Sequence, residues 1–382
     1  MLLGVACGFA IGNFVINIAP QAISGLMASH GFSAARAGAT NSIEIGAIAA
    51  TCMLLSPVLH RFDHRRSIAF GSALLIVCNL VTAVASGPAL IAGIRGVAGV
   101  GTGVVLAAAS SALVMATDPD RLYAQAALLI SLVMTGVIYF IAGVKQSFGH
   151  AGLMLAFSGV VLVCTLPAIR LIPRANPVKE QTLRAFREVL LGAGALSVIA
   201  MLVFSVLEGS IWNFAERAAM NVGLDDRQVG LLLSVSMFSG LIGAVVSVLA
   251  GHALGREWPI IVGSALIGLC GLFIYNPPST ALLVGSLAIF NLGYFLVIPF
   301  IFGGSSELDA SGRLSATVAG VQVLGGAIGP GFAGAVIERY SYAVLGYTCL
   351  ALAALTAIAG TGMALAIRRS GEGLPPVTGP VA

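Results

Sequence analysis

Long apolar stretches, separated by short polar breaks, follow one another along the whole chain. A membrane-spanning helix needs roughly 20 apolar residues, because the hydrocarbon core of a bilayer is about 30 Å thick. The first stretch begins almost at Met1 with no basic residue before it, so we expect a spanning helix and not a cleaved signal peptide. The pattern predicts helices over residues 2–28, 37–59, 67–86, 89–117, 122–143, 151–170, 189–216, 228–251, 258–275, 280–304, 313–337 and 343–367.

Composition supports the membrane interpretation. Hydrophobic residues make up 58% of the 382 residues and charged residues 9%, whereas soluble domains carry roughly 25% charged residues. In lipid, apolar side chains can face outward, and helices satisfy their own backbone hydrogen bonds. The 48 glycines allow helices to pack closely. The six cysteines are scattered singly, so we expect neither disulfides nor a metal site. The fold class is therefore an all-α membrane protein of about twelve transmembrane helices.

Basic residues set the orientation. With a cytoplasmic N-terminus, the inner loops hold 13 of the 19 Lys and Arg residues, the outer positions hold five, and Arg95 lies within a span. Cytoplasmic loops carry an excess of Lys and Arg. Both termini are thus predicted to be cytoplasmic.

The longest polar segment, residues 171–188, divides the chain into two parts of similar length. Six spans on each side of one linker suggest an internal repeat. We predict an N-terminal six-helix bundle over 1–170, a cytoplasmic linker over 171–188, a C-terminal six-helix bundle over 189–369, and a disordered Gly/Pro-rich tail over 370–382.

Two short stretches carry a resemblance to a known family. The loop after the second span contains Arg61, Asp63, Arg65 and Arg66. It resembles the signature between helices 2 and 3 of the major facilitator superfamily, although the leading Gly is replaced. The fourth span carries Arg95 followed by Gly96, Gly99, Gly101 and Gly103, which is similar to the helix-4 motif of the same superfamily.

The resemblance implies a secondary transporter that works by alternating access around a midplane site. It also implies that Asp63, Arg61, Arg65 and Arg66 form a conformational latch of the outward-facing state. Proton-coupled drug exporters of the superfamily carry a Gly-Pro motif in helix 5, and the fifth span here has only Gly136 and Gly143. That difference favours import over export.

Few ionisable residues fall inside the predicted spans, where each is costly unless it faces water or a partner. Glu44, Arg95 and Glu208 lie at similar depth in the outer half. A carboxylate in a partly desolvated cavity can bind and release a proton during a cycle, so Glu208, Glu44 and Arg95 are candidates for proton coupling. The alternative for Glu44 and Arg95 is a structural ion pair that holds the first half together.

Polar and aromatic side chains in spans that line the cavity of the superfamily are candidates for substrate binding. Asn13, Asn17 and Gln21 recur at intervals of four residues and would share one helix face. The alternative is hydrogen bonding between helices. The candidate substrate-binding residues are Asn17, Asn13, Arg95, Trp212, Asn213, Asn291, Tyr294 and Tyr139.

The predicted function is secondary active transport of a small organic solute across the bacterial inner membrane, coupled to protons. The alternatives are a proton-coupled multidrug or metabolite efflux antiporter and, more remotely, a transporter-like receptor without flux. The sequence has no phosphate-binding GxxxxGK, HExxH or GxSxG motif, so we expect neither an enzyme nor a cofactor nor a metal. The expected partners are the small-molecule substrate, protons and the lipid bilayer, with no nucleic acid, and the protein is expected to be monomeric.

The orientation can be tested by cysteine labelling. Cysteines placed within 171–188 should react with a membrane-impermeant maleimide only from the cytoplasm, because this basic segment is predicted to lie inside. Cysteines that replace Asn276 or Ser279 should react only from the other side. Labelling of both sites from one side would contradict the twelve-helix topology.

Overall fold

The computed structural model describes residues 1–55, 62–113, 119–172, 192–253, 255–308 and 313–372. Within them the chain forms twelve helices and no β-strand. The helices are α1 (Leu2–Asn17), α2 (Ala19–His30), α3 (Ala34–Leu55), α4 (His64–Val84), α5 (Pro88–Leu113), α6 (Pro119–Leu171), α7 (Ala193–Asn221), α8 (Asp226–Ala253), α9 (Glu257–Tyr275), α10 (Thr280–Leu308), α11 (Arg313–Arg339) and α12 (Tyr342–Glu372).

The helices match the predicted membrane crossings. Of the described helices, ten are long and apolar enough to cross a membrane singly, and α1 with α2 forms one further crossing bent by 46°. Helix α6 has 53 residues, about 80 Å of helix, which is more than twice the thickness of a bilayer core. Its helical dihedrals are interrupted at Gly149, where φ is 63°. We therefore count α6 as two crossings, in agreement with the predicted spans over 122–143 and 151–170.

Contacts at the two ends of α6 show that the chain reverses at Gly149. Just before this residue, the Lys145 Nζ lies 3.4 Å from the Ser24 Oγ in α2. Just after α6 ends, the carbonyl of Ile172 accepts a hydrogen bond of 2.8 Å from the Arg65 Nε at the start of α4. Helix α2 and the start of α4 lie at opposite ends of the bundle. Residues 119–172 thus run across it and back.

The first predicted span, 2–28, is not one straight helix. Helix α1 ends at Asn17, and α2 begins at Ala19 with a proline in its first turn. Pro20 has no N–H to donate to the carbonyl four residues earlier, which belongs to Ile16. Asn13 and Asn17 lie four residues apart on α1, as expected, whereas Gln21 lies beyond the bend on α2, so the three residues are not on one continuous helix.

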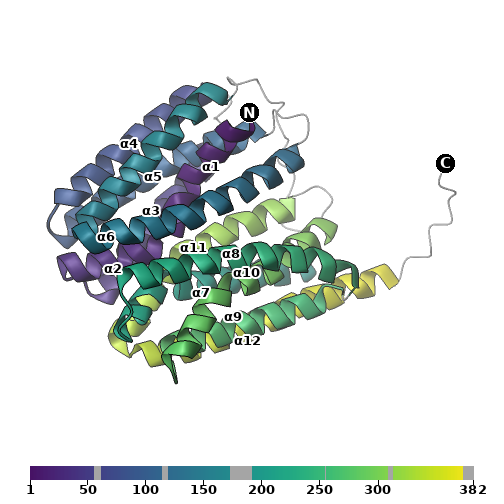
Figure 1. Ribbon diagram of the computed structural model, residues 1–382. Coiled ribbons are helices and arrows are strands. Elements are labelled where there is room, and N and C mark those ends of the chain that lie inside the picture. The colour runs from purple at the N-terminus through teal and green to yellow at the C-terminus, as the bar shows by residue number, and fades with distance from the viewer. Residues whose placement is uncertain (56–61, 114–118, 173–191, 254, 309–312, 373–382) are drawn as a thin grey trace.

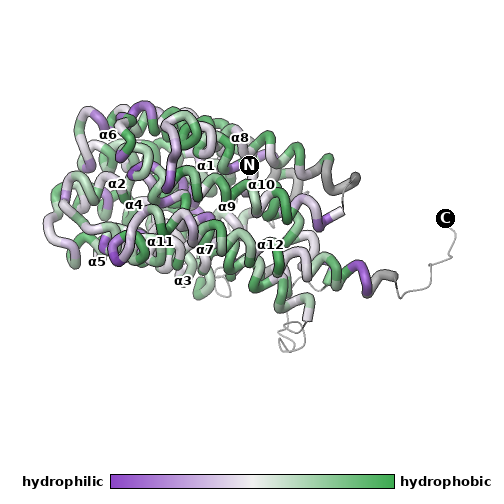
Figure 2. Tube along the Cα trace, turned by 90° about the horizontal axis from the view of Figure 1, so that it is seen from below, coloured by the Kyte–Doolittle hydropathy of each residue, from purple (hydrophilic) through white to green (hydrophobic). Residues whose placement is uncertain are grey.

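The outer surface of the helices is apolar. Val84, Leu54, Ile358 and Val163 are each more than two-thirds exposed. Exposed apolar side chains of this size and number would favour aggregation in water and are stable against lipid. Hydrophobic residues cover most of the length of the helices in Figure 2. The chain is accordingly a multi-pass membrane protein.

The helices form two bundles, α1–α6 and α7–α12, which follow the colour gradient in Figure 1. The core of the first bundle is built from buried side chains such as Phe14 and Phe157, whose rings lie 4.6 Å apart. The core of the second bundle includes Phe204, Phe214 and Phe290. The second core also includes residues of the first bundle, and these residues show where the two halves of the chain meet.

The two halves pack against each other at one end of the molecule. There the second core continues onto Ile23, Leu26, Phe32 and Ala37 of the first half. We call this region, where α2, the first turns of α3 and α8, and the last turns of α7 and α11 meet, the closed end. The opposite end, where α1 begins and α12 ends, is the terminal end. Polar contacts between the halves at the closed end and just below it include the Ala35 N–H with Glu338, the Gly331 N–H with Ser42, Asn213 with Asn41, and Trp212 with Ile16.

Glycines allow helices of one half to approach closely. A Cβ added to Gly329 in α11 would lie 2.9 Å from backbone atoms of Gly209 in α7, closer than real Cβ contacts. A Cβ added to Gly326, one turn earlier on α11, would meet nothing within 4 Å. The two positions share a helix, a residue type and a sequence neighbourhood, and they differ in the space around them.

This difference predicts opposite outcomes for two alanine substitutions. Gly329→Ala should destabilise the protein by about 1–3 kcal/mol, because α7 would have to move away from the new methyl group. Gly326→Ala should leave stability unchanged or raise it, because alanine favours a helix by roughly 1 kcal/mol over glycine. Thermal unfolding of the two purified variants measures the effect. Equal melting temperatures would contradict the close α7–α11 packing.

Candidate functional site

Arg95 of α5 is buried in the first half and holds a carboxylate from α3. Its Nε donates to the Glu44 Oε2 at 2.8 Å, and its Nη2 contacts the Glu44 Oε1. Its Nη1 donates to the Asn79 Oδ1 of α4 at 2.6 Å. Such a two-point Arg–carboxylate pair fixes geometry as well as charge. The arrangement joins three helices, α3, α4 and α5, around one cation.

The glycines after Arg95 explain how the pair forms. A Cβ added to Gly99 would lie 2.9 Å from the Ala47 Cβ of α3, and one added to Gly103 would lie 2.7 Å from the Thr51 Cβ. On the other face of α5, a Cβ added to Gly101 would lie 3.2 Å from the backbone nitrogen of Leu75 in α4. Larger residues at these positions would push α5 away from both neighbours. The spaced glycines therefore bring Arg95 within reach of Glu44 and Asn79.

A small cavity adjoins the ion pair on the side facing α2 and α6. Its lining includes Thr40, Asn41, Glu44, Arg95 and His150. Centres of water-sized molecules can occupy about 10 Å³ of it, roughly the space for one water. The ring of His150 is buried, and neither of its nitrogens has a hydrogen-bond partner in the described part of the chain. Buried polar atoms are nearly always paired, so a bound water in this cavity would satisfy one of these nitrogens.

Helix α7 presents a second group of predicted residues toward the first half. The indole N–H of Trp212 donates to the Ile16 carbonyl at 3.1 Å. This is the carbonyl that Pro20 leaves without its helical donor. One residue further, the Asn213 Oδ1 accepts a hydrogen bond of 2.7 Å from the Asn41 Nδ2. Both residues therefore lie at the boundary between the halves, next to the closed end.

Glu208 lies on the same face of α7, one turn nearer to the terminal end. The residues one turn to either side are Phe204, which packs against Tyr294 at 5.7 Å between ring centroids, and Trp212, which stacks on Phe290 at 6.1 Å. Glu208 is half-buried. It has no hydrogen bond or ion pair with any described residue. It is thus a carboxylate without a cation, between two aromatic pairs and facing the boundary between the halves.

The other predicted residues are dispersed. The Asn13 Nδ2 donates to the Phe9 carbonyl of its own helix at 2.9 Å. The Asn291 Nδ2 donates to the Ser236 Oγ at 3.0 Å, inside the second half. The Tyr294 hydroxyl accepts a bond of 2.9 Å from Gln322. Asn17 is half-buried, and Tyr139 is exposed on α6.

The predicted latch residues lie at the terminal end. Asp63 caps α4 by accepting hydrogen bonds from the backbone nitrogens of Arg65 and Arg66 at 2.8 and 3.2 Å. The side chain of Arg65 reaches Ile172 at the end of α6, so it joins two helix ends of the same half. Arg61 lies outside the described residues.

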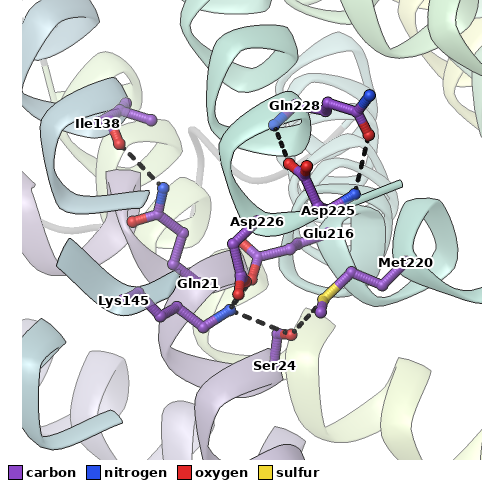
Figure 3. A network of polar contacts seen from close by, with 9 residues as sticks. All are labelled: Gln21, Ser24, Ile138, Lys145, Glu216, Met220, Asp225, Asp226 and Gln228. Carbon is purple, nitrogen blue, oxygen red and sulfur yellow. Dashed lines mark hydrogen bonds and ion pairs between the residues drawn. The ribbon is translucent and has the colours of Figure 1, made fainter. Parts of the chain in front are cut away.

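One charged cluster was missed by the sequence reasoning. Lys145 of α6 contacts Glu216 of α7 and lies 2.7 Å from the Asp226 Oδ1 of α8 (Figure 3). Lys145 lies in the break between the predicted spans over 122–143 and 151–170, so it counts among the five basic residues expected at outer positions. The signal that could have been used is charge balance: Glu216 is the last residue of the predicted span over 189–216, where a buried carboxylate requires a cation, and Asp226 lies just before the next predicted span.

Comparison with known proteins supports the fold and the family. A search of the curated proteins found no match. The structure is similar to a variant of the nucleoside transporter NupG, with a TM-score of 0.79 and 13% identity over 95% of this chain and 98% of that one. It is also similar to a D-xylose-proton symporter, with a TM-score of 0.68 and 16% identity over 100% and 98% of the two chains. A peptide transporter, POT, gives a TM-score of 0.72 at 15% identity, over 95% of each chain.

The family comparison covers most of the chain. The model of the Major Facilitator Superfamily matches residues 2–308, which include all of the first half and four helices of the second. The two bundles and the Arg95 motif are the features expected from the resemblance. The chain belongs to the Major Facilitator Superfamily.

Proposed function

We propose that this protein is a secondary active transporter that moves a small organic solute across the bacterial inner membrane by alternating access, coupled to protons. The observation that carries the proposal is Glu208. It is the ionisable residue that faces the boundary between the halves and has no charged partner among the described residues. A carboxylate without a nearby cation can bind a proton in such surroundings, and it can release that proton when water reaches it.

The packing of the halves supports alternating access. At the closed end, the core of the second half continues onto residues of the first half. At the terminal end, α9, α10 and α12 pack together within the second half as a separate small cluster, with Ile260, Phe300 and Met363 at its centre. With cytoplasmic termini, this is a conformation closed to the outside. Transport then requires the halves to rock, so that the closed end opens and the terminal end closes.

The solute site is proposed at the boundary below the closed end. Trp212, Asn213 and Tyr294 from the second half offer aromatic faces and an amide near Glu208, and Asn13 and Asn17 from α1 lie on the opposing half. Ligand pockets combine apolar and aromatic walls with a few placed polar groups. These side chains suit an uncharged or weakly charged organic solute with a planar or ring-shaped apolar part.

The role of Glu208 can be tested without knowing the direction of transport. A thermal-shift screen against sugars, nucleosides, organic acids, amino acids and amphiphilic drugs identifies a solute that binds. Uptake of that solute into proteoliposomes is then measured with and without an imposed pH gradient. Glu208→Gln should abolish uphill, gradient-driven transport but retain exchange of internal for external solute, because glutamine keeps the shape of the protonated carboxyl and cannot titrate.

Two further measurements make the test decisive. Glu307→Gln, which alters a half-exposed carboxylate paired with Arg256 at the terminal end, should leave uphill transport unchanged. Solute binding by Glu208→Gln should be independent of pH. Tight binding by this variant at all pH values indicates symport, and weak binding at all pH values indicates antiport. Uphill accumulation like that of the unmodified protein would remove the coupling role of Glu208.

The Glu44–Arg95 pair requires a separate test, since it can act in coupling or only hold the first half together. Arg95→Gln should destabilise the protein by about 3–5 kcal/mol, because Glu44 remains buried without its cation. The double variant Glu44→Gln with Arg95→Gln should recover much of that loss, because no charge is left unpaired. Thermal unfolding measures both. A double variant that is as unstable as Arg95→Gln alone would contradict the pairing.

Transport by the double variant then separates the two roles. If the pair is structural, the recovered double variant transports the solute with a pH gradient as the unmodified protein does. If the pair takes part in proton coupling, the double variant is stable and exchanges solute, but it does not accumulate it.

A further inference from the structure

Three charged side chains from three helices meet between the two halves at the closed end. Lys145 comes from α6 of the first half, Glu216 from α7 and Asp226 from α8 of the second half (Figure 3). The side chains of Lys145 and Glu216 are almost completely buried, and that of Asp226 is 18% exposed. Lys145 is thus a single cation between two carboxylates of the opposite half.

The ammonium group of Lys145 has all its hydrogens in use. It contacts Glu216, lies 2.7 Å from Asp226, and lies 3.4 Å from the Ser24 Oγ. Ser24 in turn donates to the Met220 sulfur of α7 at 3.2 Å. A lysine has three N–H donors, and here each has an acceptor. A buried charge with every donor satisfied indicates a built arrangement and not a chance approach.

The second carboxylate is held in place by the start of α8. The Asp225 Oδ1 accepts from the Gln228 N–H at 2.8 Å, and the Gln228 Oε1 accepts from the Asp225 N–H at 3.0 Å. This reciprocal pair is a capping box, which fixes the first turn of the helix. Asp226 sits in that turn, where the positive end of the helix dipole favours a negative charge. Asp226 is therefore stabilised by its own helix as well as by Lys145.

We propose that Lys145, Glu216 and Asp226 form an ionic lock that holds the closed end shut and separates whenever that end opens. The lock assigns a function to three residues outside the solute and proton sites. It rests on the proposed alternating access, but it depends neither on Glu208 nor on the identity of the solute.

The energetics suit a lock that must open repeatedly. Inside the closed end, the attraction between the charges is offset by the cost of removing them from water. When the halves separate, water hydrates all three groups, and the free energy lost by removing them from water is recovered. The lock therefore adds little net stability to the closed end, while it specifies how the halves dock. Alternating access needs such a balance, because both conformations must be populated.

Removing the charge of Lys145 should have a larger effect than removing the charge of either carboxylate, because there is one cation and there are two anions. Loss of Lys145 leaves two buried carboxylates facing each other without a cation, and that repulsion is relieved only when water enters. Loss of the Glu216 charge leaves Lys145 paired with Asp226, and loss of the Asp226 charge leaves Lys145 paired with Glu216. Neutralising the lysine should thus open the closed end far more than neutralising either carboxylate.

The test measures the distance between the halves in the full-length protein in lipid nanodiscs. Ser86 and Ser279 are exposed at the closed end, one on each half, and take spin labels as cysteines after the six native cysteines are replaced. Lys145→Gln should shift the ratio of open to closed molecules by about tenfold or more toward long distances. Glu216→Gln and Asp226→Asn should shift it less.

A triple variant tests whether charge repulsion causes the opening. Lys145→Gln with Glu216→Gln and Asp226→Asn has no charge left to repel, so its distances should return toward those of the unmodified protein. Arg256→Gln, which breaks an ion pair within the second half, should change nothing. Unchanged distances in Lys145→Gln, or equal shifts in all three single variants, would overturn the lock. No solute or pH gradient is needed, so failure here is distinct from failure of the proposed transport cycle.

Discussion

The cost of removing a charge from water governs how this molecule is arranged. A lone charge at the centre of a bilayer costs several kcal/mol, and it persists only beside a partner or beside water. Arg95 and Lys145 each meet carboxylates inside the protein, and each pairing ties together helices that are distant in sequence. The Arg95 pairing stays within the first half, whereas the Lys145 pairing spans both. The same constraint thus produces one contact that holds a bundle together and one that joins two bundles.

Close packing is what lets these charges reach each other. Guanidinium and carboxylate groups on neighbouring helices pair with good geometry only if the backbones are near, and Gly99 and Gly103 permit that approach beside Arg95. Backbone groups take part too. Pro20 cannot supply the N–H that a continuous helix would donate to the Ile16 carbonyl, and the indole of Trp212 in the other half donates to this carbonyl. The bend thus leaves a backbone acceptor with room for a donor from the other half, and Trp212 uses it.

Much of the fold could be predicted from the sequence, because hydropathy reports membrane crossings directly. The predicted crossings and their grouping into two bundles correspond to the described helices, and the family resemblance is confirmed. The pairing of Glu44 with Arg95 followed from their similar depth. The contact of Arg95 with Asn79 could not be predicted in this way, because depth does not indicate which helices lie side by side. Lys145 was missed for another reason: the helix continues to Gly149, past the polar residues at which hydropathy predicts its end.

The contrast between paired and unpaired charges distinguishes the residues that hold helices together from the residue proposed to couple protons. Arg95 and Lys145 are held by partners whose loss would leave a buried charge, so they set which helices and which halves meet. Glu208 has no such partner, and its charge can change without breaking a contact among the described residues. A proton that binds there alters the electrostatics of the inter-half boundary, where Trp212 and Asn213 already join the halves. Binding energy from a solute or a proton at this boundary can then favour one packing of the halves over the other, which is all that alternating access requires.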